Sequence, residues 1–96
     1  MSQLDALRAR REAILGLAKQ YGIRRVRIFG SVARGEERPE SDVDVLVQFE
    51  PGRSLLDQVG FGQDLEELLG RRIDVVSEGG ISPYLEAIIL REAVPL

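Results

Sequence analysis

The sequence predicts an α/β fold (α+β in some classifications), a small mixed β-sheet covered by helices in the order α-β-α-β-α-β-α. Three short runs rich in β-branched residues alternate with segments whose apolar residues follow the period of a helix, and glycine or proline marks most of the changes. With 96 residues, of which 44% are apolar and 30% charged, the chain has a globular composition. Its length predicts one domain, residues 1–96, with a single core.

The first helix is expected to begin after Ser2, which can cap it, and to end at Gly22. Its apolar residues recur at helical spacing: Leu4, Leu7, Ile14, Leu17, Ala18 and Tyr21. A strand is expected from Arg24 to Phe29, because its residues alternate between two faces. One face carries Val26 and Ile28, and the other carries Arg25, Arg27 and Phe29.

Gly30 breaks that strand, and residues 31–34 can form about one helical turn before a polar segment from Gly35 to Ser41. The strongest strand pattern of the chain follows, from Asp42 to Phe49. Residues 50–52, Glu-Pro-Gly, then predict a turn.

A second long helix is expected from the capping residue Ser54 to about Leu69, with Gly70 as its stop. Its predicted apolar stripe comprises Leu55, Leu56, Val59, Leu65, Leu68 and Leu69. Two glycines, Gly60 and Gly62, are unusual inside a helix and indicate either a tolerated imperfection or local flexibility.

The third strand is expected over Arg72–Val76, followed by a loop over residues 77–80. The last helix starts at Ser82 with proline in its first turn, and its inward side chains are expected to be Leu85, Ile88 and Ile89. This largely apolar end of the chain is interpreted as a core helix, with a protein-binding surface as the alternative.

The composition excludes several kinds of chemistry. The chain contains no cysteine and no histidine, so disulfides, thiol nucleophiles, Cys- or His-ligated zinc and a Ser-His-Asp triad are excluded. The formal net charge of −3 argues against binding of long nucleic acids. A membrane-spanning run and the apolar core of a signal peptide are both missing, which predicts a cytoplasmic protein.

Asp42 and Asp44 stand at alternate positions of the second strand, so both point to the same face, about 7 Å apart. Aspartate is a poor strand former, and two anions at this distance repel each other unless a cation lies between them. A hard divalent cation such as Mg²⁺ would be that cation. The alternative is an edge strand whose charged face is solvated.

Asp74 lies in the middle of the third strand, facing opposite to Ile73 and Val75. If the second and third strands pair, Asp74 can stand beside the other two carboxylates. Together the three make a two-metal site plausible, in which one ion stabilises leaving phosphate oxygens and one activates a hydroxyl. An ion pair with Arg71 or Arg72 is the alternative explanation for Asp74.

Gly30 and Ser31 can supply a phosphate site. Glycine at a strand end lets the backbone approach a ligand, and N–H groups at the start of a helical turn attract anions. Ser31 adds a hydroxyl and Arg34 adds a cationic fork. Taken alone, Gly-Ser is also a common turn and helix cap.

The combination of Gly-Ser, a spacer of ten residues, Asp-x-Asp and a further strand with an aspartate resembles the DNA polymerase β nucleotidyltransferase superfamily. The stretch RIFGSVARGEERPESDVDVLVQF is similar to the minimal nucleotidyltransferases, small prokaryotic proteins often encoded beside a HEPN-domain partner. The resemblance covers Ile23 to about Pro95. It implies the nucleotidyltransferase fold.

The resemblance also implies roles for the site residues. Gly30 and Ser31 would hold a nucleoside triphosphate, ATP or another NTP, while Asp42 and Asp44 would ligate two Mg²⁺ ions. Asp74 would complete the metal site and help to activate the acceptor hydroxyl. Arg34 is expected to assist in binding the nucleotide. All three carboxylates are catalytic residues in this interpretation.

Minimal nucleotidyltransferases are viewed as antitoxins of HEPN ribonuclease toxins, in some cases through adenylylation of a toxin tyrosine. The resemblance therefore implies an Mg²⁺-dependent protein adenylyltransferase with a HEPN toxin as its partner. One alternative is a non-catalytic antitoxin that neutralises the partner by direct binding. Another is a free-standing transferase acting on a small molecule or an RNA end. Homo-oligomerisation is left open.

Overall fold

The computed structural model describes residues 2–36, 38 and 41–96; three residues of the predicted polar spacer, at positions 37, 39 and 40, lie outside the described residues. The described strands form one mixed sheet in the order β3-β2-β1-β4. Their bounds are β1 Ile23–Phe29, β2 Val43–Phe49, β3 Ile73–Ser77 and β4 Val94–Pro95. β1 pairs antiparallel with β2 and with β4, whereas β2 and β3 are parallel. The predicted small mixed sheet is confirmed.

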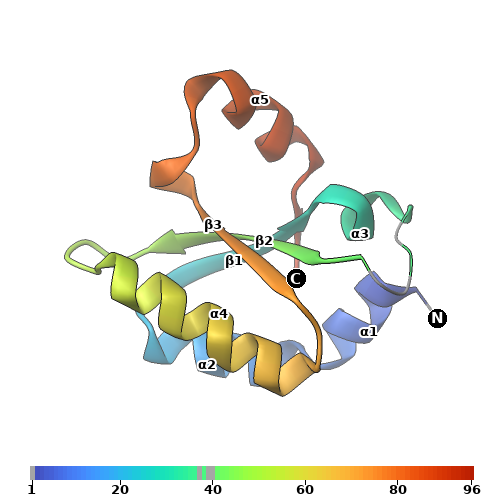
Figure 1. Cartoon of the computed structure of the whole chain (residues 1–96), viewed down its shortest axis with the longest axis horizontal. Helices are drawn as coiled ribbons and strands as arrows, with labels where there is room; N and C mark the ends of the chain where they lie inside the picture. The colour runs from blue at the N-terminus through green and yellow to red at the C-terminus, as the bar shows by residue number, and fades with distance from the viewer. Residues whose placement is uncertain (1, 37, 39–40) are drawn as a thin grey trace.

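The helices flank this sheet on two sides. Their bounds are α1 Gln3–Ala9, α2 Arg11–Gln20, α3 Gly30–Arg34, α4 Leu55–Leu69 and α5 Pro83–Glu92, with a 3₁₀ turn η1 at Glu78–Gly80. α2 and α4 lie together on one side of the sheet, and α5 lies on the other side beyond β3 and β4 (Figure 1). None of the described helices is long and apolar enough to cross a membrane.

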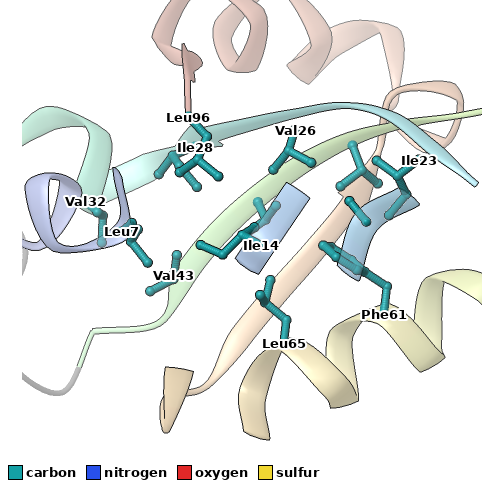
Figure 2. Packing of buried hydrophobic residues seen from close by; sticks show 13 residues of the cluster. Leu7, Ile14, Ile23, Val26, Ile28, Val32, Val43, Phe61, Leu65 and Leu96 are labelled. Carbon is teal, nitrogen blue, oxygen red and sulfur yellow. The ribbon is translucent and has the colours of Figure 1, made fainter. Parts of the chain in front are cut away.

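The first predicted helix is divided into α1 and α2, because a 3₁₀-type hydrogen bond interrupts the α-helical pattern at Arg10. The Arg10 N–H donates to the carbonyl of Leu7 at 3.0 Å, which is an i→i−3 bond. The Arg10 carbonyl then accepts from the N–H of Ile14 at 3.1 Å, so the helical pattern restarts immediately. The bend allows Leu7 on α1 and Ile14 on α2 to enter the same core from different directions (Figure 2).

The core lies between the sheet and the pair α2 and α4 (Figure 2). The alternating valines Val43, Val45 and Val47 of β2 are at most 1% exposed. Across from them pack Phe61 and Leu65 of α4, which are equally buried. Full burial of one such side chain stabilises the fold by about 1.5–3 kcal/mol, so β2 is held as a fixed platform for the residues on its other face.

The glycine at position 60 has a packing role. A methyl group there would lie 2.7 Å from Cε1 of Tyr21, so only glycine lets the end of α2 come this close to α4. The Tyr21 ring packs edge-on against Phe61 at 6.2 Å between centroids, and its hydroxyl donates to Asp64. The sequence pattern left this glycine as an imperfection or a flexible point, and the structure shows a tight helix contact.

The predicted inward stripe of α4 is wrong at its start. Leu55, Leu56 and Val59 are 71%, 80% and 48% exposed, whereas Phe61 and Leu65 fill the core. The physical reason is that α4 is longer than the strand on which it packs. A helix of 15 residues spans about 22 Å and packs on β3, which has five residues and spans about 17 Å.

The last helix also differs from expectation. No residue of α5 is buried; Leu85 and Ile88 are 47% and 49% exposed, and Ile89 is only half-buried. α5 packs against α3 on the side of the sheet away from the main core. The interpretation of this segment as a core helix is therefore wrong.

Four smaller differences concern element bounds, one unpredicted strand and the burial of one side chain. Asp42 directly precedes β2 instead of starting it, residues 78–80 form a 3₁₀ turn instead of a loop, and the two-residue strand β4 was not predicted. Arg27 was expected beside Arg25 on an outer face, yet it is only 9% exposed because its guanidinium pairs with Glu78.

Candidate active site

Asp44 and Asp74 meet because β2 and β3 run parallel in a register that pairs these two residues. Val43 and Val45, which flank Asp44, face the core, and Ile73 and Val75, which flank Asp74, pack against it. Since successive strand residues alternate between faces, both aspartates lie on the face away from α2 and α4. Asp44 is half-buried and Asp74 is exposed.

Gly30 lies against Asp44. Phe29, the last residue of β1, pairs with Asp44 across the sheet, so the turn into α3 begins beside that carboxylate. Gly30 has φ of 73°, a left-handed conformation that favours glycine. A methyl group at Gly30 would lie 2.1 Å from Oδ2 of Asp44. The carboxylate therefore occupies space that a side chain at position 30 would need.

The negative charge at this point is concentrated. Burial, followed by the neighbouring carboxylates of Asp74 and Asp42, raises the pKa of Asp44 above the ordinary aspartate value. Arg34 acts in the opposite direction, but its effect is smaller. A cation placed among these carboxylates would lower the repulsion.

Asp42 forms an ion pair with Arg72. Its Oδ1 lies 3.6 Å from Nε of Arg72, and the side chains are 51% and 83% exposed. Both arginines that were the alternative partners for Asp74 therefore have other contacts: Arg72 pairs with Asp42, and Arg71 donates to the carbonyl of Ser41. An exposed pair such as Asp42–Arg72 contributes about 0–1 kcal/mol, so Asp42 can turn toward Asp44 at little cost.

Within the described part of the chain, no group of three or more acidic side chains already has the arrangement of a complete metal site. The residues present nevertheless suit a hard cation. Carboxylate oxygens are the ligands that Mg²⁺ prefers, Asp44 and Asp74 are side by side, and Asp42 is tied only by a weak surface pair. Asp42, Asp44 and Asp74 are therefore the residues that could hold Mg²⁺.

Ser31 and Arg34 lie on α3, the short helix that follows Gly30. Ser31 is in its first turn, where backbone N–H groups are free of helical partners, and the side chain is partly accessible. Gly35 ends α3 with φ of 72°. The predicted phosphate-binding residues are therefore next to Asp44, as one connected turn.

Arg34 is held by two carboxylates. Its Nε lies 3.1 Å from Glu36 and its Nη1 lies 3.0 Å from Glu92 at the end of α5. These hydrogen bonds, the one to Glu36 first, raise the pKa of Arg34 despite partial desolvation. A triphosphate would have to compete with both carboxylates for this side chain.

Two ion pairs of this region, Arg34–Glu92 and Arg27–Glu78, were not predicted from sequence. Glu92 adds a further negative charge that raises the pKa of Asp44, and it holds Arg34; its position at the end of a predicted core helix gave no signal. The Arg27–Glu78 pair was missed because Arg27 matched the alternating pattern of a solvent face. The Arg27 Nε is buried without a hydrogen-bond partner in the described structure.

Comparison with known proteins identifies the family of the chain. A family model described as a nucleotidyltransferase domain matches residues 10–96, so the chain belongs to that family. A relative from Methanocaldococcus jannaschii, named as a putative protein adenylyltransferase, is 46% identical over 81 residues, 84% of this chain and 87% of that protein. Protein adenylyltransferase MntA of Thermococcus cleftensis is 41% identical over 78 residues, 81% and 79% of the two chains.

Solved structures extend the comparison to the fold. A structure described as a putative minimal nucleotidyltransferase has a TM-score of 0.87 and 57% identity, with 100% of this chain and 97% of that chain covered. A chain from a complex of the tri-AMPylated HEPN toxin of Shewanella oneidensis with its MNT antitoxin has a TM-score of 0.70 at 17% identity, covering 92% and 69%. The second likeness shows the fold alone.

Proposed function

We propose that residues 1–96 form one Mg²⁺-dependent protein adenylyltransferase domain, which transfers AMP from ATP to a tyrosine hydroxyl of a HEPN-type toxin and so acts as its antitoxin. The relatives named as protein adenylyltransferases support the reaction class, and the fold shared with an MNT antitoxin supports the partner class. A reaction that consumes ATP would take place in the cytoplasm.

The observation that carries the proposal is the in-register pair of Asp44 and Asp74 next to Gly30. Two carboxylates, one with a raised pKa, face a turn that can receive phosphates. Asp42, Asp44 and Asp74 would hold Mg²⁺, up to two ions. When bound, Mg²⁺ would offset the charge of the triphosphate and ease ionisation of the attacking hydroxyl.

The chain's own residues would position the reactants. Gly30 and the N–H groups of the first turn of α3 bind the triphosphate, and the hydroxyl of Ser31 donates to a phosphate oxygen. Arg34 leaves Glu92 and contacts the same phosphates. The acceptor oxygen attacks the α-phosphorus, its proton passes to Asp74, and the bond to the β-phosphate breaks to release pyrophosphate. Catalysis of this kind rests mainly on positioning and electrostatic stabilisation.

Intact-mass spectrometry of the adjacently encoded partner tests this proposal. The partner is incubated with the protein, Mg²⁺ and each of the four NTPs in turn. A mass gain of one or more AMP units with ATP, absent with Asp42→Asn/Asp44→Asn, is the expected result. An unchanged partner mass with every nucleotide would refute the enzymatic proposal.

A second candidate is a non-catalytic antitoxin, and the exposed apolar face of α5 favours it. Tyr84 is 85% exposed, and Leu85 and Ile88 are about half exposed. Apolar side chains that the fold leaves uncovered are typical of a protein-binding surface. Since α5 carries no buried residue, its apolar character serves no purpose in the core of this chain.

The two candidates differ in what neutralises the partner. If binding alone is sufficient, Asp42→Asn/Asp44→Asn still blocks the partner's toxicity, whereas Tyr84→Ser/Ile88→Ser abolishes complex formation without lowering stability. Loss of neutralisation in the aspartate variant, with complex formation intact, would exclude the non-catalytic candidate.

A further inference from the structure

β1 has one incompletely paired edge. Toward β2 it is paired from Ile23 to Phe29. On the other side β4 pairs only with Arg27 and Ile28, and in the sheet of described residues β4 is the outermost strand. Residues 23–26 of β1 therefore have no strand partner along this edge within the described structure. Such an edge presents backbone N–H and C=O groups that another strand can use.

A pocket of about 720 Å³ lies along this open edge, between β1, α2 and the end of β4. Its apolar lining includes Ile23, Ala18 and Leu15, and Leu15 is 42% exposed. Every charged residue that lines it is basic: Arg8, Arg11, Lys19, Arg24 and Arg25. In a chain with a net charge of −3, this one-sign lining makes the surroundings of the pocket locally positive.

Within the described residues, none of these five cations forms an ion pair with aspartate or glutamate; the ion pairs there use Arg27, Arg34, Arg53 and Arg72. Two already contact the backbone of the neighbouring strand end: Arg8 donates to the carbonyl of Pro95 and Arg11 to that of Leu96, both at 2.9 Å. Lys19, Arg24 and Arg25 also line the pocket; Arg25 in addition borders a second pocket, which Glu78 and Glu86 line.

We propose that this edge binds a short, acidic, extended segment of a partner protein, which adds to the sheet as a strand beside residues 23–26, in line with β4. Backbone hydrogen bonds to the open edge supply affinity, as in other cases of strand addition. Alternate side chains of the segment contact the apolar lining around Leu15 and Ile23. Its carboxylates pair with Lys19, Arg24 and Arg25, which sets specificity.

The two alternatives fit less well. A long nucleic acid would meet the overall negative charge of the chain beyond this pocket, and it would leave the β1 edge unpaired. A free phosphate would use the cations but not the apolar lining or the open edge. A peptide strand uses all three features.

This edge lies away from the catalytic carboxylates. Phe29 pairs with Asp44 at one end of β1, and Ile23 is six residues farther along, about 20 Å at strand rise. A segment bound at residues 23–26 leaves the site around Asp44 open. The inference therefore does not depend on the proposed transfer activity.

Fluorescence anisotropy with a labelled octapeptide of alternating glutamate and valine tests the proposal, without nucleotide or metal. Two matched probes separate the contributions: the same peptide N-methylated at every second residue, which keeps the charge but blocks strand pairing, and a peptide of alternating lysine and valine. A labelled single-stranded oligonucleotide represents nucleic acid, and inorganic phosphate serves as a competitor.

We expect the acidic peptide to bind, and both N-methylation and Lys19→Glu/Arg24→Glu to weaken it at least about tenfold. Arg91→Glu, a reversal of an exposed charge on α5, should leave binding within about twofold. Binding that survives N-methylation, tighter binding of the oligonucleotide, displacement by millimolar phosphate, or no peptide binding at all would overturn the proposal.

Discussion

Oδ2 of Asp44 lies where a side chain at Gly30 would begin, 2.1 Å from the ideal Cβ position. The turn proposed to bind phosphate and the carboxylate of Asp44 are thus fitted to each other by the absence of one methyl group. β1 brings Gly30 to this point because Phe29 pairs with Asp44. A change at either residue should affect the other.

Gly30→Ala tests this relationship. Placing a side chain in a left-handed conformation costs about 1–2 kcal/mol, and the contact with Asp44 adds to that cost. Gly35→Ala is the matched control, because Gly35 has nearly the same φ of 72° but nothing within 4 Å of its Cβ position. Urea unfolding should show the larger loss for Gly30→Ala, and Asp44→Ala should recover the difference. Equal losses at the two glycines would contradict the close contact.

Asp44→Asn should stabilise the protein at neutral pH in metal-free buffer. The folded state binds the proton of Asp44 more tightly than the unfolded chain, since burial and the neighbouring carboxylates raise its pKa. The free energy of unfolding therefore falls as pH rises from the ordinary aspartate value through the raised pKa. The variant avoids this loss, so its advantage at pH 7 should vanish near about pH 3. Thermal unfolding at both pH values measures it; a less stable variant at pH 7 would contradict the prediction.

The buried pair of Arg27 and Glu78 should behave asymmetrically. Glu78→Gln leaves the Arg27 side chain, which is only 11% exposed, without its counter-charge. Because Glu78 itself is 26% exposed, we expect a loss of about 2 kcal/mol, below the 3–5 of fully buried pairs. Arg27→Met/Glu78→Leu should cost less than Glu78→Gln alone. Chemical denaturation measures the free energy of unfolding of both variants. A double variant that is less stable than Glu78→Gln would contradict this prediction.

Arg34 should contribute to ATP binding, and Glu92 should oppose it. Arg34→Ala is expected to weaken ATP about tenfold, the size of one charge-assisted contact. Glu92→Gln removes one of the two carboxylates that hold Arg34, so it should bind ATP more tightly than the unmodified protein. Calorimetry without acceptor measures both, with Arg91→Ala as the control. Weaker ATP binding by Glu92→Gln would show that Glu92 positions Arg34 for the nucleotide.

Local patterns were sufficient for the three longer strands and for most helix limits. The valine alternation in β2 and the glycine at the end of α4 depend on nearest neighbours along the chain, and both predictions are confirmed. The sequence alone does not determine whether the second and third strands pair, so the placement of Asp74 beside Asp44 was only conditional. The parallel register of β2 and β3 places the two residues opposite each other.

The errors have a common physical origin. The exposure of Leu55 on α4 and Ile88 on α5 depends on how far the sheet extends beneath each helix, which periodicity does not report. The burial of Arg27 depends on Glu78, which lies 51 positions later in the numbering. Likewise, Glu92 reaches Arg34 only because α5 returns to α3. Such contacts are set by tertiary structure.

Nucleotidyl transfer by the proposed Asp44–Asp74 site can be tested with labelled ATP. The protein and its adjacently encoded partner are incubated with Mg²⁺ and ATP labelled at either the α- or the γ-phosphate. We expect label in the partner from α-labelled ATP, none from γ-labelled ATP, release of pyrophosphate, and loss of transfer in Asp74→Asn. Label from the γ-phosphate, or transfer unaffected by Asp74→Asn, would contradict the proposal.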